Sequence, residues 1–436
     1  MIPSNSLFAS TGEIYGFGSR SQSMANTSLS SGIDSTAVYY NPAALSSTPG
    51  FKFDYGMSYF HPQFLEINNV VVSNSSTTAT GQTKGSVDTE GYLDHFSQAI
   101  SFSYTFLESF KNFSIGMLGS MPIARLAYMD TGDPFKPEYY NYRAQTQRPE
   151  FYVGSSVKPW KFLSLGLGLA YNANIASGAN YTLSASNGTV SYGRVNTTVK
   201  PSVSPYFSVS SENDSFNVAS TFRMASKTKM ELEVTSNTRV LSSSSDFPIM
   251  YNSASTVYSS PPELDLGFSQ KIYSNWWVTA EADWLGYSHS DPPSLSVTDT
   301  GSSIQLRNSI TTKPELQDII VYKIGGEYEI TPSWKLRAGF SHRPMPLKDS
   351  SLAGNYVDPA KNVYSAGAGF DLHQAGFTKS SLTLNIHTQY HHLIRQTIKK
   401  SDGTEAGTTG QSKIGSPEYD IGGKIFGGGI SISMLF

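Results

Sequence analysis

The feature that constrains the fold most is a strict alternation of apolar and polar residues over long segments of the chain. In residues 276–287, one set of alternate positions is wholly apolar and comprises Trp276, Val278, Ala280, Ala282 and Trp284. The positions between them include Thr279, Glu281 and Asp283. Because successive side chains of a β-strand point to opposite sides, this segment predicts a strand with one face suited to lipid and one charged inner face.

Two further segments repeat this arrangement. In residues 333–342 the apolar positions stand opposite Lys335, Arg337 and Ser341, and in residues 319–330 they stand opposite Lys323, Glu327 and Glu329. We therefore expect the even-numbered residues of 276–287 and 333–342 to face lipid. The set containing Glu281, Lys335 and Arg337 should face the interior.

The same pattern extends along most of the chain and predicts about fourteen strands. They lie near residues 51–60, 96–107, 112–122, 149–158, 161–175, 200–210, 214–235, 262–273, 276–287, 316–330, 333–343, 361–372, 380–394 and 424–436. Their lengths suit the ~9–11 residues that a tilted strand needs to cross a bilayer. The predicted fold is all-β, a transmembrane antiparallel β-barrel of about 14 strands over residues 51–436.

The connections between these strands alternate between short and long. Short polar turns are expected at 108–111, 158–161, 212–214, 274–275 and 331–333, and loops of about twenty residues or more follow one strand later, as in bacterial barrels. The loop 176–199 is rich in Ser, Asn and Gly, and the loop 236–261 carries few apolar residues. A soluble sandwich or propeller also has many short alternating strands, but strands of this length with aromatic ends favour the barrel.

Composition removes several other classes of protein. Charged residues make up 15% of the chain and aromatic residues 13%, against about 25% charged residues in an average soluble protein. No apolar run approaches the ~18 residues of a membrane-spanning helix. The absence of cysteine excludes disulfides and thiolate sites. With a net charge of -3 and no basic cluster beyond Lys399 and Lys400, nucleic acid is not an expected partner.

Residues 1–50 break the period-two pattern and are rich in Gly and Ser. They nevertheless carry more apolar side chains than a solvated leader usually does, namely Ile14, Tyr15, Phe17, Val38, Tyr39 and Tyr40. We therefore predict that residues 1–50 form a plug, or hatch, inside the barrel. The first residues lack the charged and apolar regions of a secretory signal, so we expect any targeting segment to have been removed already.

A resemblance to a known family enters at Asn41, Pro42 and Ala43. This triplet lies in the segment 35–45, after the Gly/Ser-rich region and directly before the first strand, and resembles the end of the hatch in the FadL family of outer-membrane channels for hydrophobic compounds. Further similarity covers residues 262–284 and 325–340. The resemblance implies a bacterial outer-membrane protein without enzymatic activity or cofactor that takes up long-chain fatty acids or aromatic hydrocarbons passively.

The resemblance also implies that ligand binds near the hatch and leaves sideways where the third strand is kinked. In that strand, Gly119 has no side chain to pack, and Met121 precedes Pro122, which removes a ladder donor, so we expect pairing to fail there. Alternatively, Pro122 simply ends the strand. We further expect Asn41, Pro42 and Ala43 to pack beside this irregular stretch.

Three basic residues are predicted to face the lumen: Arg223, Lys323 and Arg337. They could bind a ligand carboxylate, since a guanidinium matches that anion, or else pair with acidic neighbours such as Glu281, Asp283 and Glu327. The chain ends on Phe436, which resembles the signal by which barrels reach the outer-membrane assembly machinery. Expected partners are thus a hydrophobic ligand, membrane lipids and that machinery, and the protein is expected to be a monomer.

No constellation in the sequence supports chemistry. His387 and His391 would lie ~13 Å apart on a strand, too far to share a metal ion. Glu281 and Asp283 would lie ~7 Å apart, which suits paired carboxylates, but a lattice of charges explains them better. An enzyme is therefore not expected. The remaining alternatives are a general porin for polar solutes, which should lack a plug, and a surface adhesin or receptor that acts through its loops.

Overall fold

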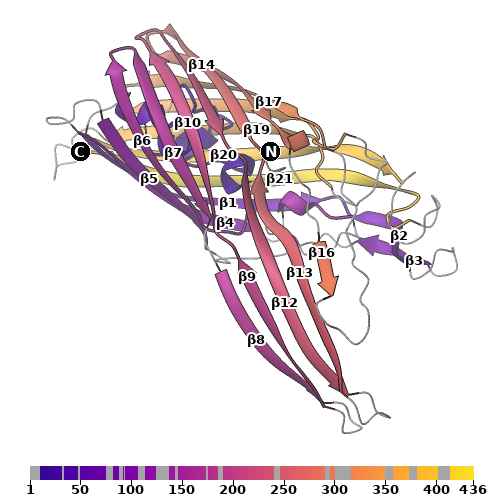
Figure 1. Cartoon of the computed structure of the whole chain (residues 1–436). Coiled ribbons are helices and arrows are strands. Elements are labelled where there is room, and N and C mark those ends of the chain that lie inside the picture. The colour runs from indigo at the N-terminus through magenta and orange to yellow at the C-terminus, as the bar shows by residue number, and fades with distance from the viewer. Residues whose placement is uncertain are drawn as a thin grey trace.

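The structure is a computed structural model of the chain, and fourteen of its strands form a closed antiparallel barrel (Figure 1). It describes residues 10–31, 34–47, 50–74, 82–87, 92, 94–106, 113–123, 137–142, 146–172, 175–184, 190–239, 246–289, 295–299, 316–348, 357–372, 381–400 and 413–436. Around the barrel, each strand pairs with the next barrel strand along the chain, and β1 pairs with β21 to close it. The predicted fold class is confirmed.

Each of the fourteen predicted segments overlaps one barrel strand, and the segment 214–235 extends beyond it. The strands are β1 (Gly50–Phe64), β4 (His95–Thr105), β5 (Phe113–Pro122), β6 (Glu150–Trp160), β7 (Leu163–Asn172), β10 (Ser202–Glu212), β11 (Phe216–Arg223), β14 (Glu263–Tyr273), β15 (Trp276–Leu285), β17 (Ile319–Thr331), β18 (Trp334–Arg343), β19 (Lys361–Leu372), β20 (Ser381–Lys399) and β21 (Glu418–Leu435). Closure is completed at the last residue, because the backbone N–H of Phe436 donates to the carbonyl of Phe51 at 2.9 Å.

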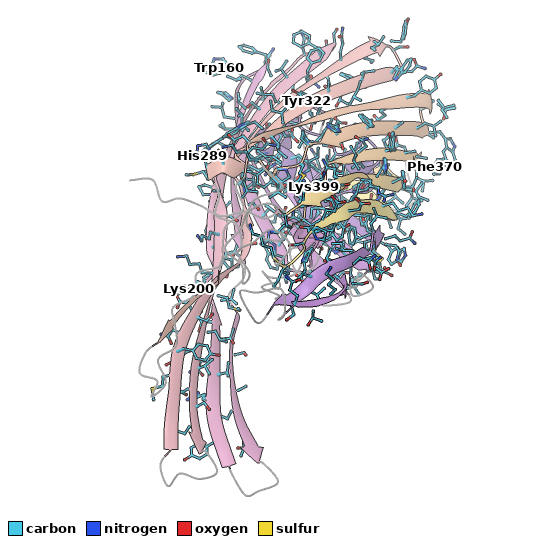
Figure 2. All side chains as sticks on the ribbon, turned by 90° about the vertical axis from the view of Figure 1, so that its right-hand side faces the viewer. Trp160, Lys200, His289, Tyr322, Phe370 and Lys399 are labelled. Atoms are coloured by element: carbon cyan, nitrogen blue, oxygen red, sulfur yellow. The ribbon has the colours of Figure 1, made fainter. Side chains whose placement is uncertain are left out.

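The two faces of the barrel wall have the predicted orientation. Tyr322 and Ile324 of β17 are 57% and 52% exposed, whereas Glu281 and Asp283 of β15 and Arg337 of β18 are buried inside. Figure 2 shows outward side chains such as Trp160 and Phe370 on the outer surface of the barrel. The apolar outer face matches lipid, and the charged inner face is shielded from it.

Turns and loops agree with the expected alternation, with two corrections. The predicted turns at 158–161, 212–214, 274–275 and 331–333 each lie at the junction of two consecutive barrel strands, and the turn at 108–111 lies outside the described residues. The predicted strand 214–235 is in fact two strands, β11 and β12 (Ser226–Arg239), since the chain leaves the barrel wall after Arg223. The helices among the described residues are all too short to cross a membrane.

The second correction concerns the expected loops 176–199 and 236–261, which largely form strands. β8 (Ile175–Ser184), β9 (Val190–Val199), β12, β13 (Asp246–Ser260) and β16 (Leu295–Asp299) make a separate five-stranded sheet that projects from the barrel near Lys200 (Figures 1 and 2). A smaller hairpin consists of β2 (Ile67–Asn74) and β3 (Gln82–Val87). These strands pair with one another outside the barrel wall, so their polar composition does not prevent strand formation.

The hatch lies inside the barrel, and its described residues form four short helices: α1 (Thr11–Ile14), α2 (Ser19–Gln22), α3 (Ala37–Tyr40) and the 3-10 helix η1 (Pro42–Ser47). The apolar residues that predicted a plug are all buried. Ile14 and Tyr15 pack with the wall residues Phe60 and Ile425, and Phe17 belongs to a second cluster with α3. Two further 3-10 helices, η3 (Tyr140–Tyr142) and η4 (Tyr287–His289), lie in the connections between barrel strands.

Candidate functional site: the hatch and its aromatic cavity

Asn41, Pro42 and Ala43 form the turn at which α3 ends and η1 begins. The amide nitrogen of Asn41 donates to the carbonyl of Leu29 at 2.8 Å, and its amide oxygen accepts from the backbone N–H of Ala43 at 3.1 Å. Pro42 begins η1, a position that suits proline because the first residues of a helix have no intrahelical acceptor for their N–H groups. The Asn41 side chain thus stabilises the fold of the hatch, because it donates one hydrogen bond and accepts another.

The same turn is pressed against the wall at β6, β7 and β10. The N–H of Ala43 also contacts Ser208 Oγ on β10 at 2.8 Å. A side chain at Gly166 of β7 would place its Cβ 2.3 Å from the backbone nitrogen of Ala43, and one at Gly154 of β6 would meet Pro42 at 3.4 Å. Glycine at 166 is therefore required by the close approach of the two backbones.

This position differs from the expected one beside Gly119, Met121 and Pro122. None of the contacts described for Asn41, Pro42 or Ala43 reaches that stretch of β5. Both α3 and η1 lie against β5, and Val38 of α3 comes close to it, with Cγ2 2.5 Å from where a Cβ of Gly116 would stand. The difference arises because Gly154 and Gly166 form a recess for the turn that could not be recognised without the register of β6 and β7.

Pairing of β5 also differs from expectation at Gly119. That residue lies opposite Ile100 of β4 and Phe151 of β6 with no shift of register on either side. The irregularity begins two residues later. Pairing with β4 continues to Pro122, whereas pairing with β6 stops at Ser120 and Glu150.

The end of this β5–β6 seam has a simple cause. In the antiparallel register, Met121 would lie opposite Pro149, and Pro122 follows on β5, so a proline interrupts each strand. Because proline has no N–H, the ladder cannot continue between them. The first helical residue of the hatch, Thr11, meets the wall close by. The N–H of Thr11 donates to Glu150 Oε1 at 3.1 Å, and its hydroxyl donates to the carbonyl of Thr146 at 3.1 Å.

Next to this seam lies a cavity of about 550 Å³ with aromatic walls. We call it the aromatic cavity. Its lining includes Tyr39 of the hatch and Tyr152 and Tyr206 of the wall, together with Ala170 and Met224. The rings of Tyr39 and Tyr152 meet edge to face at a centroid distance of 5.0 Å. The tyrosine rings supply apolar surface on one side, and polar side chains that include Glu13, Arg148 and Asn172 complete the lining.

Arg223 closes one side of the aromatic cavity. Its guanidinium donates to the carbonyl of Tyr39 at 2.5 Å, lies 3.3 Å from a carboxylate oxygen of Glu263 and sits over the Tyr39 ring at 4.5 Å. Arg223 thereby connects the wall to the hatch backbone. Of the three predicted lumen cations, it is the one that borders the aromatic cavity.

The other two predicted cations, Lys323 and Arg337, form ion pairs with acidic neighbours. Lys323 Nζ lies 2.5 Å from Asp283 and 3.7 Å from Glu281, and Arg337 Nε lies 2.6 Å from Glu327. Pairing with acidic neighbours is the alternative to ligand binding that the sequence left open for Lys323 and Arg337. Whether any of the three meets a ligand stays a prediction.

Several contacts of the hatch with the wall were not predicted. Arg20 of α2 pairs with Glu327, with Nε 3.1 Å from Oε2. Glu13 of α1 accepts a hydrogen bond from the Tyr287 hydroxyl at 2.8 Å, and its burial between hatch and wall raises the pKa of its carboxyl to about 7. Alternation placed Glu327 on the inner face, but no pattern in residues 1–50 indicates which wall residue Arg20 meets.

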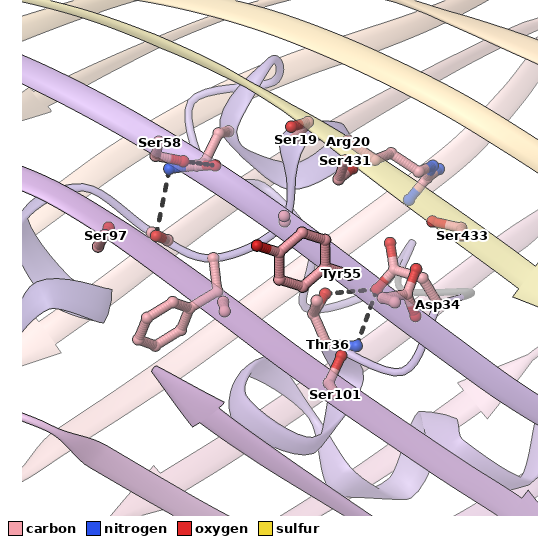
Figure 3. A pocket seen from close by; sticks show the side chains of 17 residues that line it. Ser19, Arg20, Asp34, Thr36, Tyr55, Ser58, Ser97, Ser101, Ser431 and Ser433 are labelled. Carbon is pink, nitrogen blue, oxygen red and sulfur yellow. Dashed lines mark hydrogen bonds between the residues drawn. The ribbon is translucent and has the colours of Figure 1, made fainter. Parts of the chain in front are cut away.

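On the opposite side of the hatch, small hydroxyl side chains line a pocket of about 480 Å³ (Figure 3). They come from three strands of the wall: Ser58 on β1, Ser97 and Ser101 on β4, and Ser431 and Ser433 on β21. Ser35 of the hatch shares a hydrogen bond with Ser101, its hydroxyl 2.7 Å from that of the wall serine. The small polar side chains let the hatch backbone approach this wall closely.

Comparison with known proteins places the chain among outer-membrane channels. A family model described as "Outer membrane protein transport protein (OMPP1/FadL/TodX)" matches residues 15–416. Alkane uptake protein A of Marinobacter nauticus is 21% identical over 400 residues, which cover 87% of this chain and 83% of that protein.

Solved structures with the same fold include a FadL homologue of Pseudomonas aeruginosa, with a TM-score of 0.63, 13% identity and coverage of 100% of this chain and 99% of the other. The toluene transporter TbuX of Ralstonia pickettii gives a TM-score of 0.57 at 13% identity, covering 97% and 99%. The toluene transporter TodX of Pseudomonas putida gives 0.55 at 13% identity, with the same coverage. At such identities the likeness establishes the fold.

Proposed function

The chain belongs to the OMPP1/FadL/TodX family of outer-membrane transport proteins, and from this premise we propose that its ligand binds in the aromatic cavity beside the hatch and leaves through the β5–β6 seam. As a member of this family it is a channel for hydrophobic compounds in the outer membrane and not an enzyme. In this proposal, residues 1–50 act as the movable hatch and residues 51–436 as the barrel.

The ligand class we propose is a long-chain fatty acid, an alkane or an aromatic hydrocarbon. A relative named for alkane uptake and similar folds named as toluene transporters support an apolar ligand. An apolar path is needed because each methylene exposed to water forfeits about 0.8 kcal/mol of transfer free energy. Arg223 at the edge of the aromatic cavity could take a carboxylate if the ligand has one.

The observation that carries the proposed exit is the early end of β5–β6 pairing. Beyond Ser120 and Glu150, no ladder bonds need to be broken for the two strands to separate. Thr11 of the hatch donates to Glu150 at this point, so a shift of α1 would remove one of the hydrogen bonds that hold this side chain at the end of the seam. Met121 and Pro149 are both only half-buried, consistent with an opening that reaches the lipid-facing side.

The test is to close the seam covalently. The chain has no native cysteine, so the double variant Met121→Cys with Pro149→Cys contains a single possible disulfide. Opposed residues on neighbouring strands have Cα atoms about 4.5–5.5 Å apart, within the range that a disulfide bridges. The matched control is Met117→Cys with Val153→Cys, an outward pair on the same two strands that is already in register.

We expect oxidation of the 121–149 pair to lower uptake of a radiolabelled hydrocarbon, and a reductant to restore it. Oxidation of the 117–153 pair should leave uptake unchanged. Undiminished uptake with the 121–149 disulfide formed would show that ligand leaves elsewhere. The cavity of about 1260 Å³ at the short-turn end, lined in part by Lys158, Lys161 and Trp277, would then be the next route to close.

Two further expectations accompany this proposal. We propose that the terminal residue Phe436 is recognised by the outer-membrane assembly machinery, and its ring lies 5.7 Å from that of Phe51 at the strand junction that closes the barrel. We also propose that the protein works as a monomer, because the hatch and the aromatic cavity are complete within one chain.

A further inference from the structure

Four carboxylates gather on the inner wall next to the aromatic cavity. They belong to Glu263 and Asp265 of β14 and to Glu281 and Asp283 of β15, and all four line a cavity of about 720 Å³ between wall and hatch. We call them the acidic cluster. One oxygen from each of Glu263, Asp265 and Asp283 lies within 4.8 Å of the others.

The acidic cluster has more negative charge than its neighbours neutralise. Arg223 and Lys323 are the two cations that pair with it, which leaves a formal charge of two negatives on four carboxylates. The other charged residues that line this cavity do not alter the balance. Arg343 is paired with Asp358 at 2.9 Å, and Lys361 and Glu13 carry opposite formal charges.

Two buried oxygens of the cluster also lack a partner among the described residues. Asp265 and Asp283 are only 5% and 3% exposed, and Oδ1 of each has no hydrogen-bond donor, while Oδ2 of each faces Arg223 or Lys323. A buried carboxylate oxygen without a partner is costly, because burial removes its water and nothing replaces it. The arrangement therefore has room for one more positively charged group.

We propose that the acidic cluster binds one divalent cation with a preference for oxygen ligands, of which Ca²⁺ is the best match. Ca²⁺ takes oxygens at about 2.3–2.6 Å, so two of its ligands stand at most about 5 Å apart, which the three clustered oxygens satisfy. Its two charges equal the excess on the cluster. Glu263, Asp265 and Asp283 would supply ligands, with water completing the shell.

The site is placed where it would affect the hatch. Glu281 accepts the backbone N–H of Leu29 at 2.6 Å, and Arg223, held by Glu263 and Asp265, donates to the carbonyl of Tyr39. An ion drawing on Glu263 and Asp265 would share these carboxylates with Arg223. Through its ligands the cation would connect β14 to β15 in the wall. It would also change the strength of the hydrogen bond by which Arg223 holds the carbonyl of Tyr39 in the hatch.

The experiment measures cation binding directly on the folded protein in detergent after treatment with a chelator. Tb³⁺ replaces Ca²⁺ as a luminescent probe, with Tyr39 and Tyr40 in the same cavity as energy donors, and calorimetric titration with Ca²⁺ gives the stoichiometry. The variants are Asp265→Asn and Asp283→Asn. The matched control is Asp371→Asn, a buried inner-face carboxylate of β19 that pairs with Lys335 at 2.7 Å outside the cluster.

We expect the unaltered protein to bind one Ca²⁺ per chain, and Asp265→Asn and Asp283→Asn to weaken binding by about ten-fold or more. Asp371→Asn should change affinity by less than about two-fold, since it supplies no ligand. Absence of Tb³⁺ luminescence and of Ca²⁺ heat in the unaltered protein would overturn the site, whatever the variants do. Equal affinity in Asp283→Asn and the unaltered protein would also overturn it.

Discussion

Arg20 of the hatch and Arg337 of the wall share one carboxylate, with Glu327 Oε2 3.1 Å from the first Nε and 2.6 Å from the second. The Arg20–Glu327 ion pair joins α2 to β17 inside the barrel, where both side chains are buried from water that could replace a lost partner. Replacing Arg20 therefore removes a charged hydrogen bond between hatch and wall while Glu327 keeps Arg337.

We predict that Arg20→Gln loosens the hatch by about 1.5–3 kcal/mol, the usual contribution of a hydrogen bond to a charged group. Hydrogen exchange of hatch amides should accelerate accordingly. The control is Arg395→Gln, because Arg395 pairs with Asp420 at an exposed position where such pairs contribute about 0–1 kcal/mol. Similar exchange in both variants would contradict the role of the Arg20–Glu327 pair.

The close contact between the Asn41-Pro42-Ala43 turn and Gly166 of β7 gives a second prediction. Gly166→Ala should destabilise the folded protein by about 1–3 kcal/mol, the typical cost of overpacking, since the new methyl would meet the backbone of Ala43. Gly326→Ala is the control, because a Cβ there would come no closer than 3.4 Å to any atom. Thermal unfolding in detergent measures both. A Gly166→Ala protein as stable as Gly326→Ala would show that the turn is not pressed against β7.

The orientation of β18 is tested with one lysine on each face. Ala338 faces outward near the middle of the strand, so Ala338→Lys should cost about 2–4 kcal/mol in the bilayer. Ser341→Lys should be tolerated, because it points into the large cavity that contains the acidic cluster. Unfolding by denaturant in lipid vesicles gives the two free energies. Equal costs would mean that the faces are assigned wrongly.

The titration of Glu13 gives a dependence of stability on pH. Its pKa is raised from 4.5 to about 7 by burial, so between these values the folded protein binds a proton that the unfolded chain does not. The contribution of this group is therefore present in full below pH about 4.5 and is lost as pH rises toward about 7. Glu13→Gln should remove this part of the pH dependence of the melting temperature. An unchanged profile in the variant would contradict the assignment.

The barrel could be predicted from sequence because the alternation of apolar and polar residues can be recognised within each strand alone. Residues such as Trp276 and Glu281 show which face they occupy from their immediate neighbours, and the wall is a series of neighbouring pairs. The strands beyond the barrel were missed because β8 and β9 have no lipid-facing side, and their Ser- and Asn-rich sequence resembles a loop. The period-two test recognises a face buried in lipid, which these strands lack.

The site could be predicted only in part. The buried apolar residues of the hatch and the inner position of Arg223 follow from composition and alternation, but their partners do not. Tyr152 and Tyr206 come together with Tyr39 because of the register of β6 and β10 and the path of the hatch. Both Gly119 and Pro122 were expected to disturb pairing. Pairing is regular at Gly119, β5 ends at Pro122, and the part of Pro149 depends on the register of β6, which the sequence alone does not reveal.

The central claim is that hydrophobic compounds pass through the aromatic cavity beside the hatch, and uptake of radiolabelled hexadecane by cells expressing the protein tests it most directly. The informative variant is Ala170→Trp, which would fill the cavity between Tyr152 and Tyr206 from β7. Small-sugar permeation into proteoliposomes, measured in parallel, reports any open polar pore.

We predict that the unaltered protein raises hexadecane uptake above that of cells without it, that Ala170→Trp abolishes the gain, and that sugar permeation stays low in both. Hexadecane uptake equal to that of cells lacking the protein, together with rapid sugar permeation, would contradict the account and indicate a general porin.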